Sequence, residues 1–301
     1  MKFLFVGDYS NFHVSLATEL KRLGHETTIV SSGSRCMDTQ RDINLVREPG
    51  FVGGMKYMYR LFSVMSKMRG YDVVQLINPN FFELRPGKIR YFFNELRRHN
   101  RSVFLSLAGS DPYYVRMCCR SEELRYSEYG WGKEAPPFAQ QNPTNELEWQ
   151  TVEMLNHCED IYNGVDGAVS CLYEYDVAGR YYLKDKLSYI GIPIDLESVG
   201  YMPAPLGEKI NIFVGIKSEY KAFKGTDRLL AAAQRIEAEM PDRCRVEVVE
   251  NLPYKEYMRR LEDADIVLDQ LYSYTPATNA LGAMAMGKVV VSGAEPEFYD
   301  F

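Results

Sequence analysis

The sequence predicts an α/β protein built from two Rossmann-like halves, each with a parallel sheet covered on both faces by helices. Three observations carry this prediction. Short apolar runs of strand length alternate with amphipathic runs of helical spacing along most of the 301 residues. Alternation of this kind forms βαβ units, whose strands lie parallel. An aperiodic, proline-containing stretch divides the alternation into two series, and a chain of this length has room for about two domains.

The first series spans residues 1–192 and is predicted to form an N-terminal domain. It opens with a strand at 2–7 that stops at Gly7, followed by a helix that ends at Gly24. Further strands are expected at 25–32, 71–78, 102–109, 165–172 and 186–193, and helices at 57–68, 88–100 and 146–163. Residues 112–150 are rich in aromatic residues and proline but lack periodicity, so they are expected to form a long loop, and such loops are often functional.

The second series spans residues 209–301 and follows a predicted linker at 193–208. Its strands are expected at 209–215, 245–250, 265–271 and 288–293, and its helices at 227–240, 254–263 and 276–286. The sequence stops shortly after the last of these strands. A doubly wound domain normally continues with further helices, so the second domain is expected to be incomplete at its C-terminus.

Composition and charge exclude several classes of protein. A formal net charge of -6 argues against a general nucleic-acid binder, so an anion site would have to be local. No apolar run reaches the roughly 18 residues of a membrane span. The six cysteines form no C-x-x-C pair and the four histidines are scattered, so reduced thiols, a cytoplasmic location and no metal site are expected. The D-x-D of residues 263–265 joins a helix to a strand, which favours a structural role.

Two lysines mark a candidate anion site in the second half. Lys217 lies just beyond the predicted strand 209–215, and Lys224 precedes Gly225 at the start of the next helix. Ligands of open α/β sheets bind outside the carboxyl ends of strands, and a helix N-terminus favours anions. The competing interpretation is a solvated surface loop.

A second helix start strengthens this prediction. Thr275 is a suitable N-cap and Pro276 a suitable first helical residue, and Thr278 and Asn279 add polar groups to the first turn. Small residues in this helix would let a ligand or another backbone approach closely, although they also suit a tightly packed core helix. Two anion-favouring helix starts in one domain suggest a diphosphate ligand.

Four stretches carry a family resemblance: GHETTIV, GIPID, FVG…KGTDRLL and ADIVLDQL…ALGAMAMGKVVVSG. Together they resemble retaining GT-B glycosyltransferases of the family-four type. The resemblance implies a GT-B fold with an inter-domain cleft, a nucleotide-diphosphate-sugar donor, and a saccharide or lipid-linked acceptor in glycan or cell-envelope polysaccharide synthesis. No cofactor or metal is implied. The donor-binding candidates are Lys217, Lys224, Gly215, Gly225, Glu250, Leu252, Tyr274, Thr275, Thr278 and Asn279, with the two lysines on the diphosphate.

The chain departs from this family at two positions. The family usually carries two glutamates eight positions apart, and here Tyr274 and Gly282 stand in their places. Asp269, Glu295 and Glu297 are nearby carboxylates that could substitute for them. A catalytically impaired nucleotide- or sugar-binding module, or a partner subunit of an active transferase, is therefore the alternative function.

The N-terminal half supplies candidates for the acceptor side of the cleft. Gly7, Asn11 and His13 follow the first strand, and a capping role for Ser10 or Asn11 is an equally good interpretation. The stretch LSLAGSD places Ser110 and Asp111 where the family often has a histidine. Asp111 is a candidate contact to the donor sugar, or a turn carboxylate ahead of Pro112.

Two further segments have candidate roles. The aromatic loop 112–150 is a candidate acceptor lid or a packed insertion. Residues 88–101 combine four arginines with Phe92 and Phe93, which makes them a candidate for peripheral contact with the inner face of a membrane. The alternative is an ordinary Rossmann helix with its phenylalanines in the core and its arginines in water.

Overall fold

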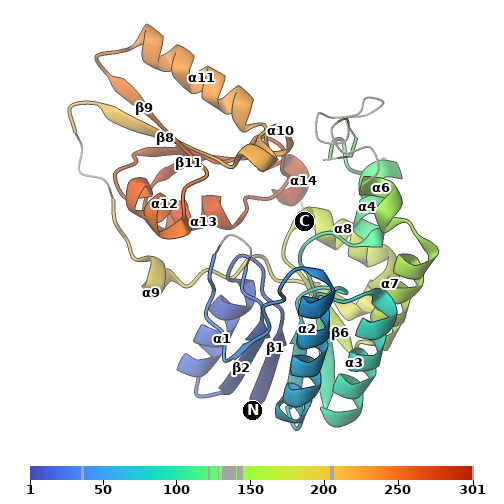
Figure 1. Cartoon of the computed structure of the whole chain (residues 1–301). Helices are drawn as coiled ribbons and strands as arrows, with labels where there is room; N and C mark the ends of the chain where they lie inside the picture. Colours follow the sequence, from blue (N-terminus) through green and yellow to red (C-terminus); the bar gives the residue numbers. More distant parts are fainter. Residues whose placement is uncertain are drawn as a thin grey trace. The chain divides into compact units, whose positions relative to one another are not determined.

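The computed structural model describes residues 1–34, 37–120, 123–127, 129–130, 140, 145–203 and 207–299. They form two compact units (Figure 1). Unit 1 comprises Met1–Met117 and Glu146–Pro193, and unit 2 comprises Cys118–Asn145 and Ile194–Phe301. Each unit is an α/β structure with its own parallel sheet, as the sequence predicts.

Unit 1 carries a seven-stranded sheet in the order β3-β2-β1-β4-β5-β6-β7. Its strands are β1 (Lys2–Val6), β2 (Glu26–Ser31), β3 (Ile43–Asn44), β4 (Val73–Leu76), β5 (Ser102–Leu107), β6 (Gly167–Ser170) and β7 (Leu187–Tyr189). Its helices are α1 (Phe12–Arg22), α2 (Gly50–Val64), η1 (Met65–Met68), α3 (Pro86–His99), α4 (Pro112–Arg120), α6 (Asn145–Trp149), α7 (Val152–Gly164), α8 (Tyr173–Leu183) and η2 (Lys184–Lys186). The strand order reverses between β1 and β4, which makes that junction the topological switch point of the sheet.

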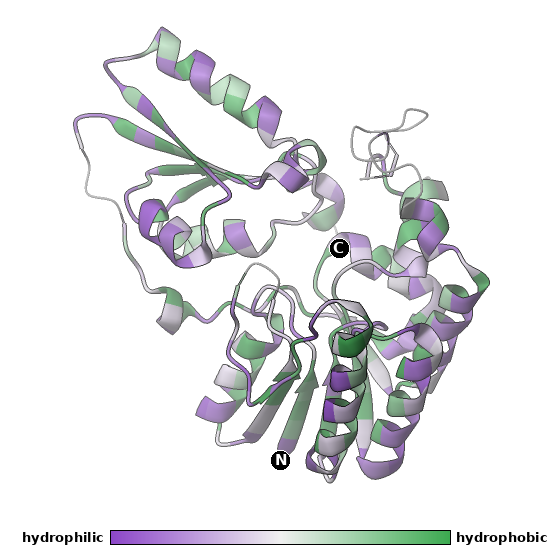
Figure 2. Ribbon diagram, viewed as in Figure 1, coloured by the Kyte–Doolittle hydropathy of each residue, from purple (hydrophilic) through white to green (hydrophobic). Residues whose placement is uncertain are grey.

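Helices cover both faces of this sheet. Neighbouring residues of β1 point to opposite sides of the sheet and are apolar, so each face has side chains to bury. Leu4 packs in the larger core with Leu61 of α2 and Phe92 of α3. Phe5 packs on the other face with Ala17 of α1. Hydrophobic residues run along the strands, while the helices show mixed surfaces (Figure 2).

Unit 2 carries a four-stranded parallel sheet in the order β11-β10-β8-β9. Its elements are α9 (Leu196–Val199), β8 (Ile210–Ile216), η3 (Ser218–Tyr220), α10 (Lys221–Lys224), α11 (Thr226–Glu239), β9 (Cys244–Glu250), α12 (Tyr254–Leu261), β10 (Ile266–Leu268), α13 (Thr278–Ala285), β11 (Val289–Val291) and α14 (Pro296–Tyr299). Val214 of β8 packs with Ala233 of α11, whereas Phe213 packs with Ala283 of α13 on the opposite face.

Several elements differ from the sequence prediction. Residues 112–120 were predicted to begin a long loop, but they form helix α4. Asp111 stabilises the start of this helix by accepting hydrogen bonds from its first backbone N–H groups. The helix predicted at 146–163 is divided into α6 and α7, since the Thr151 side chain caps α7 by accepting from Met154 N–H. Part of the candidate lid, residues 121–122, 128, 131–139 and 141–144, lies outside the described residues.

The division of the chain also differs from the predicted boundaries. The predicted N-terminal domain ran without interruption over 1–192, but Cys118–Asn145 groups with unit 2. Residues 201–202 of the predicted linker pack against the end of α13. Met202 N–H donates to the Met286 carbonyl, and the Tyr201 ring lies against Gly287, where a Cβ would meet a ring carbon at 2.4 Å. These contacts give residues 201–202 a fixed place on the C-terminal end of α13.

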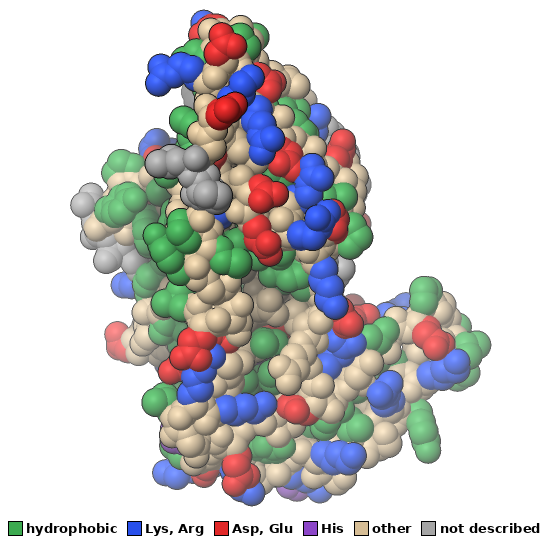
Figure 3. All heavy atoms as spheres, turned by 90° about the vertical axis from the view of Figure 1, so that its left-hand side faces the viewer, with side chains coloured by type: hydrophobic (Ala, Val, Ile, Leu, Met, Phe, Trp, Pro, Cys, Tyr) green, Lys and Arg blue, Asp and Glu red, His purple; other side chains and the backbone are tan. Residues whose placement is uncertain are grey.

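Charged residues are mixed on the surface. The face in Figure 3 shows Lys and Arg interspersed with Asp and Glu. Among the described residues, no helix is both long enough and apolar enough to cross a membrane.

Candidate functional site

The two lysines of the predicted anion site flank a turn at the carboxyl edge of the unit 2 sheet. Lys217 directly follows β8, and Lys224 ends the short helix α10. Both side chains are half-buried. The Lys217 ammonium group lies 5.6 Å from the centre of the Tyr220 ring, close enough for a cation–π contact. The segment predicted as a loop is therefore ordered by two short helical turns.

Gly225 lets this turn pack closely against the loop that follows β10. Its φ of +66° lies in the left-handed region, and a Cβ there would meet Tyr272 at 2.8 Å and Leu271 at 2.9 Å. The Leu271 N–H also donates to the Lys224 carbonyl at 2.7 Å. Only glycine fits both constraints. The K-G turn, residues 224–225, thus lies directly beside the segment that leads to α13, as the predicted two-terminus site requires.

The end of β9 is joined to the Lys217 segment. The Ser218 hydroxyl donates to the Glu250 carboxylate, and the Ser218 N–H donates to the Asn251 side chain at 3.1 Å. Asn251 adopts a φ of +54° here. Leu252 follows with 37% of its surface exposed, just before α12 begins. Glu250 is thereby placed beside the lysine segment, with one oxygen taken by Ser218.

The helix predicted to start at Pro276 starts two residues later. Its N-cap is Ala277 and its first residue is Thr278. The Ser273 hydroxyl donates to the Thr275 carbonyl, which keeps residues 273–275 in a local turn. Thr275 is buried and does not cap the helix. Thr278 and Asn279 therefore form the first turn, as predicted, without Thr275.

Asn279 is the centre of a polar cluster in that first turn. Its side-chain amide donates to Asp269 at 2.8 Å, and its oxygen accepts from the Tyr257 hydroxyl at 2.8 Å. Burial raises the pKa of Tyr257, so the hydroxyl stays protonated and remains a donor. Gly215 makes room for this tyrosine, because a Cβ there would lie 2.5 Å from its ring. Gly215 and Asn279 are thus linked through one side chain.

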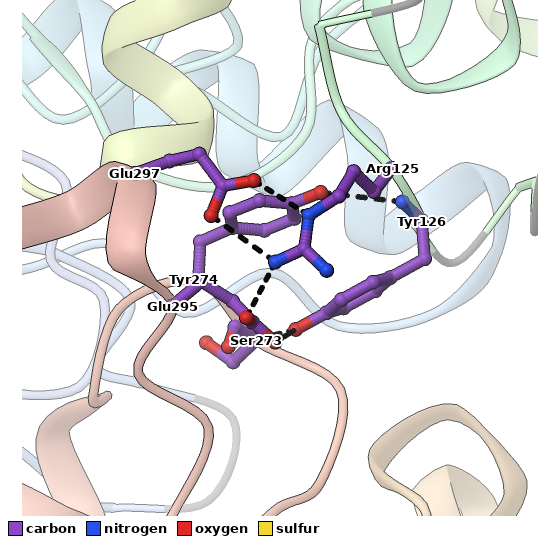
Figure 4. A network of polar contacts seen from close by, with 6 residues as sticks. All are labelled: Arg125, Tyr126, Ser273, Tyr274, Glu295 and Glu297. Atoms are coloured by element: carbon purple, nitrogen blue, oxygen red, sulfur yellow. Dashed lines mark hydrogen bonds and ion pairs between the residues drawn. The ribbon is translucent and has the colours of Figure 1, made fainter.

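Tyr274, at the first family glutamate position, is covered by residues 125 and 126 of the same unit. Its ring stacks on Tyr126 with centroids 4.9 Å apart, and its hydroxyl accepts from Tyr126 N–H at 3.2 Å. Arg125 forms ion pairs with both Glu295 and Glu297 (Figure 4). The Tyr126 hydroxyl donates to Glu295 at 2.7 Å. We call residues 125–126 the strap.

The three carboxylates considered as replacements for the family glutamates all have protein partners. Asp269 is 3% exposed and accepts from Asn279 and from Ser292. Glu295 and Glu297 are engaged by the strap, and the hydrogen bond from Arg125 lowers the pKa of Glu297. Gly282, at the second glutamate position, has open space around it: a Cβ would meet nothing within 4 Å.

In unit 1, Gly7 and Asp8 form the turn after β1. Gly7 has a φ of +79°, and a Cβ there would lie 2.3 Å from a side-chain carbon of Ile77. Asp8 is 2% exposed, and its Oδ1 accepts from His13 N–H at 2.8 Å. Asn11 occupies the N-cap position of α1 with a φ of 65°, but its side chain makes no capping bond and contacts the Met37 sulfur at 3.6 Å. Asp8 therefore accepts the hydrogen bond at this helix start for which Ser10 or Asn11 was one of two interpretations.

His13 is an interior residue. It is fully buried, with Nδ1 2.6 Å from the Gly7 carbonyl and Nε2 3.3 Å from the Ser106 hydroxyl. Because a carbonyl only accepts, Nδ1 carries the proton and Nε2 accepts from Ser106, which in turn accepts from Gln75 at 2.8 Å. Burial lowers the pKa of His13 to about 3, so the ring is neutral. These contacts tie β1, β4 and β5 together.

Asp111 and Ser110 follow β5. Asp111 is 4% exposed and accepts from the N–H groups of Tyr113 and Tyr114, each at 2.8 Å, and from the Tyr162 hydroxyl at 2.7 Å. Burial raises its pKa, against the effect of these hydrogen bonds. These contacts agree with the alternative interpretation of Asp111, that of a turn carboxylate ahead of Pro112. The Ser110 carbonyl accepts from Asn78 at 3.5 Å.

Sequence reasoning missed two residues. Asp8 is a carboxylate directly after the glycine that ends the first strand, a position the switch-point rule selects. Arg125 lies in an aperiodic segment, and no sequence pattern connects it to residues 170 positions later. The described residues contain no group of three or more His, Cys, Asp or Glu side chains that could hold a metal ion.

No protein-family model matches the sequence, and no curated protein is similar to it. Solved structures are similar over almost the whole chain. One is the catalytic domain of starch synthase IV from Arabidopsis thaliana bound to ADP and acarbose, with a TM-score of 0.59 and 9% identity over 96% of this chain and 82% of that one. Another is WaaG, a glycosyltransferase involved in lipopolysaccharide biosynthesis, with a TM-score of 0.52 and 12% identity over 100% and 84%. A third is UDP-GlcNAc 2-epimerase from Neisseria meningitidis bound to UDP-GlcNAc, with a TM-score of 0.51 and 11% identity over 100% and 85%.

These likenesses show that the chain has the GT-B fold. The class agrees with the resemblance found in the sequence. Because the fold is shared by transferases and an epimerase, the activity has to be argued from the residues of this chain.

Proposed function

We propose that the protein is a glycosyltransferase that moves a sugar from a nucleotide-diphosphate donor to a saccharide or lipid-linked acceptor, with retention and without a metal. The observation that carries the proposal is the K-G turn of unit 2. Half-buried Lys224 is part of this turn, and half-buried Lys217 precedes it at the carboxyl end of β8, in a chain of net charge -6. Lysine serves phosphate as a mobile point charge, and the helix start at Gly225 adds free N–H groups.

The roles of the residues follow from the chemistry of the leaving group. Cleaving the sugar–phosphate bond places negative charge on the departing diphosphate, and Lys217 and Lys224 would stabilise that charge. In a retaining reaction, the leaving phosphate would itself take the proton of the acceptor hydroxyl, so the protein would contribute positioning and charge. Glu250 and Leu252, after β9, would line the side of the nucleotide base, and Thr278 and Asn279 would face the diphosphate.

The test is product identification after incubation with UDP-glucose, GDP-mannose or ADP-glucose and octyl glucoside as acceptor. We expect one donor to give a new glycoside with the anomeric configuration of the donor, seen by proton NMR. Lys217→Ala and Lys224→Ala should abolish turnover, while Lys221→Ala, a lysine of the same segment outside the assigned pair, should retain it.

Two outcomes would replace this proposal. Conversion of a UDP-sugar to its 2-epimer without a glycoside product would indicate epimerase activity. Nucleotide binding without turnover of any donor, with octyl glucoside or with water, would favour the binding-module or partner-subunit alternative.

We also propose peripheral contact with an anionic membrane, but through α2. The phenylalanines that suggested α3 are buried, Phe92 at 0% and Phe93 at 2% exposure, so they form no membrane face. On α2, Phe51, Met55, Tyr59 and Phe62 are 81%, 52%, 79% and 52% exposed at positions that share one side of a helix. Residues 50–99 hold nine Lys and Arg against three Asp and Glu, a net charge of +6 in a chain of net charge -6.

This combination of exposed aromatic residues and positive charge fits an anionic bilayer surface. Sedimentation with phosphatidylglycerol vesicles should pellet the protein, and phosphatidylcholine vesicles should not. The double variant Phe51→Ser, Tyr59→Ser should stay in the supernatant, while Tyr299→Ser, which removes a 73% exposed tyrosine from unit 2, should pellet. Pelleting of the double variant to the wild-type extent would contradict the assignment of α2.

A further inference from the structure

The strap contacts two neighbouring parts of unit 2 at the carboxyl edge of its sheet. Residues 273–274 belong to the loop after β10, and Glu295 and Glu297 follow β11. Neither residue of the strap lies in a helix or strand. Its segment, Cys118–Asn145, groups with unit 2, although the chain on either side of it belongs to unit 1. The strap could therefore leave unit 2 without breaking any strand pairing of the sheet.

Arg125 supplies the charge that holds the strap in place. Its guanidinium donates to both oxygens of Glu297 and to Glu295, and it lies 5.9 Å from the centre of the Tyr274 ring (Figure 4). The Arg125 side chain is 54% exposed, so salt screens these ion pairs and each contributes little free energy. Contacts of this strength break and re-form readily, which suits a reversible attachment.

Tyr126 covers a tyrosine at the edge of the sheet where ligands bind. Its ring stacks on Tyr274, and its hydroxyl lies 3.2 Å from the Ser273 carbonyl. Tyr274 is 1% exposed as a result of its packing in this loop and beneath the strap. Ligands of open α/β sheets bind outside the carboxyl ends of the strands. The strap therefore covers surface that a ligand at this edge would otherwise meet.

The strap is also connected to the K-G turn through one aromatic ring. Tyr126 meets Tyr272 edge-on, with ring centroids 6.2 Å apart. The Tyr272 ring packs so closely on Gly225 that a Cβ there would lie 2.8 Å from it. The Arg228 guanidinium, in the first turn of α11, lies 5.9 Å from the centre of the same ring. Movement of the strap would thus free a side chain that packs directly on the K-G turn.

We propose that the strap is an autoinhibitory latch. While Arg125 is paired with Glu295 and Glu297, the loop after β10 is covered and a diphosphate enters slowly at the K-G turn. Release of Arg125 uncovers the loop and speeds entry. The inference rests on the proposed function, because it concerns the regulation of the diphosphate site. The competing role is that of a support that holds the loop in its binding conformation, and release would then slow or weaken binding.

The first measurement follows the opening of the strap without any nucleotide. Hydroxyl-radical footprinting of the full chain, read by mass spectrometry of its peptides, reports the accessibility of Tyr274. Oxidation of Tyr274 should be about fivefold faster in Arg125→Ala, and it should rise in the wild type between about 50 mM and about 500 mM salt. Arg235→Ala should behave as the wild type, and buried Tyr57 of unit 1 should stay protected throughout. Unchanged oxidation of Tyr274 in Arg125→Ala would overturn the proposal.

A charge exchange tests whether the ion pairs hold the latch. Arg125→Glu places like charges together and should open the strap at least as far as Arg125→Ala. Combining Arg125→Glu with Glu297→Arg restores an opposite-charge pair and should return the oxidation of Tyr274 toward the wild-type rate. Oxidation as fast in the exchanged variant as in Arg125→Glu would contradict an electrostatic latch.

The second measurement follows nucleotide entry. Stopped-flow mixing with N-methylanthraniloyl derivatives of UDP, GDP, ADP and CDP gives the association rate constant of the nucleotide that binds. This constant should be about fivefold higher for Arg125→Ala than for the wild type, because the closed form is depleted. Arg235→Ala should match the wild type. Association with Arg125→Ala that is equally fast or slower would overturn autoinhibition and favour the supporting role.

The outcome is separable from that of the proposed function. If a nucleotide binds the wild type and Arg125→Ala at the same rate, the latch fails and the transferase assignment stands. If Tyr274 becomes accessible in Arg125→Ala while no nucleotide binds either protein, the transferase assignment fails and the latch over this edge stands.

Discussion

Both units have carboxylate side chains at the carboxyl edge of a parallel sheet, but these carboxylates differ in how many hydrogen-bond and ion-pair partners they have. In unit 1, Asp8 lines a cavity, and its Oδ2 accepts no hydrogen bond from the residues that the structure describes. In unit 2, Glu295 and Glu297 are engaged by Arg125, and Tyr126 adds a further donor to Glu295 (Figure 4). A paired carboxylate at a sheet edge serves the structure. A buried carboxylate oxygen without a partner costs stability, so the two regions differ in how completely their carboxylates are satisfied.

The largest expected effect is the loss of stability when a carboxylate with hydrogen bonds to both of its oxygens is removed. Asp111 lies at the same sheet edge as Asp8, but both of its oxygens are engaged by three donors. Asp111→Ala leaves these donors unsatisfied, so chemical denaturation should show a loss of about 3 kcal/mol or more in the free energy of unfolding. Asp111→Asn should lose less, because an amide oxygen can still accept from the backbone. A loss below about 1 kcal/mol for Asp111→Ala would show that the hydrogen bonds of this carboxylate do not stabilise the unit as the comparison assumes.

The second effect concerns pH. The pKa of His13 is lowered to about 3 in the folded state from an ordinary value of 6.5. Between these values the unfolded chain binds a proton that the folded chain does not, so stability is full above 6.5 and falls as the pH falls through this window. From pH 7 to pH 5 the free energy of unfolding should drop by about 2 kcal/mol on account of His13.

A substitution isolates that contribution. Burial also lowers the pKa of His157, which adds a loss in the same direction. His13→Gln should therefore flatten part of the pH dependence of the free energy of unfolding. An identical pH profile for His13→Gln and the wild type would contradict the interior assignment of His13.

The third prediction concerns a substitution that places a carboxylate at the second family glutamate position in unit 2. Gly282 lies in α13, and a Cβ added there meets no atom within 4 Å, so a longer side chain can start from this position. Gly282→Glu should stabilise the helix by about 0.5–1 kcal/mol, because glycine is a poor helix former, and should tighten nucleotide binding in calorimetry. Gly282→Ala is the control that separates helix propensity from the carboxylate. Equal nucleotide affinity in both variants would show that this position does not reach the ligand.

The smallest effect on global stability is expected at the strap. Its ion pairs are solvent-accessible and should be screened by salt. Arg125→Ala should leave the unfolding midpoint almost unchanged but speed hydrogen exchange at residues 273–275 and 295–297. Arg235→Ala, which breaks an exposed ion pair with Glu239 on α11, should not change exchange there. Unchanged exchange in Arg125→Ala would show that the strap does not hold these loops.

The fold was largely predictable because it depends on local periodicity. Strand β8 and helix α11 lie within one residue of the strand predicted at 209–215 and the helix predicted at 227–240. The place of Gly225 at the start of α11 was also predictable, because glycine readily adopts the left-handed conformation that it has there. The start of α13 was not, because the Ser273 hydroxyl competes for the Thr275 carbonyl and delays the helix.

The rest of the candidate site depends on contacts that sequence spacing does not encode. Helices α2 and α3 both combine aromatic and basic residues, yet α3 buries Phe92 whereas α2 exposes Phe51. Which side of an amphipathic helix meets the sheet is settled by packing. The pairing of Arg125 with Glu297 joins distant parts of the chain, and the unpaired oxygen of Asp8 is defined only once its neighbours are placed.

The most direct test of the central claim is calorimetric titration of the full chain with UDP, GDP, ADP and CDP. The wild type would be compared with Lys217→Ala, Lys224→Ala and Lys221→Ala. We predict that one nucleotide binds, and that the first two variants each weaken it by roughly 1.5–3 kcal/mol while the third does not. If no nucleotide binds, or if the Lys217 and Lys224 variants bind as tightly as the wild type, the K-G turn is not a diphosphate site and the transferase proposal is contradicted.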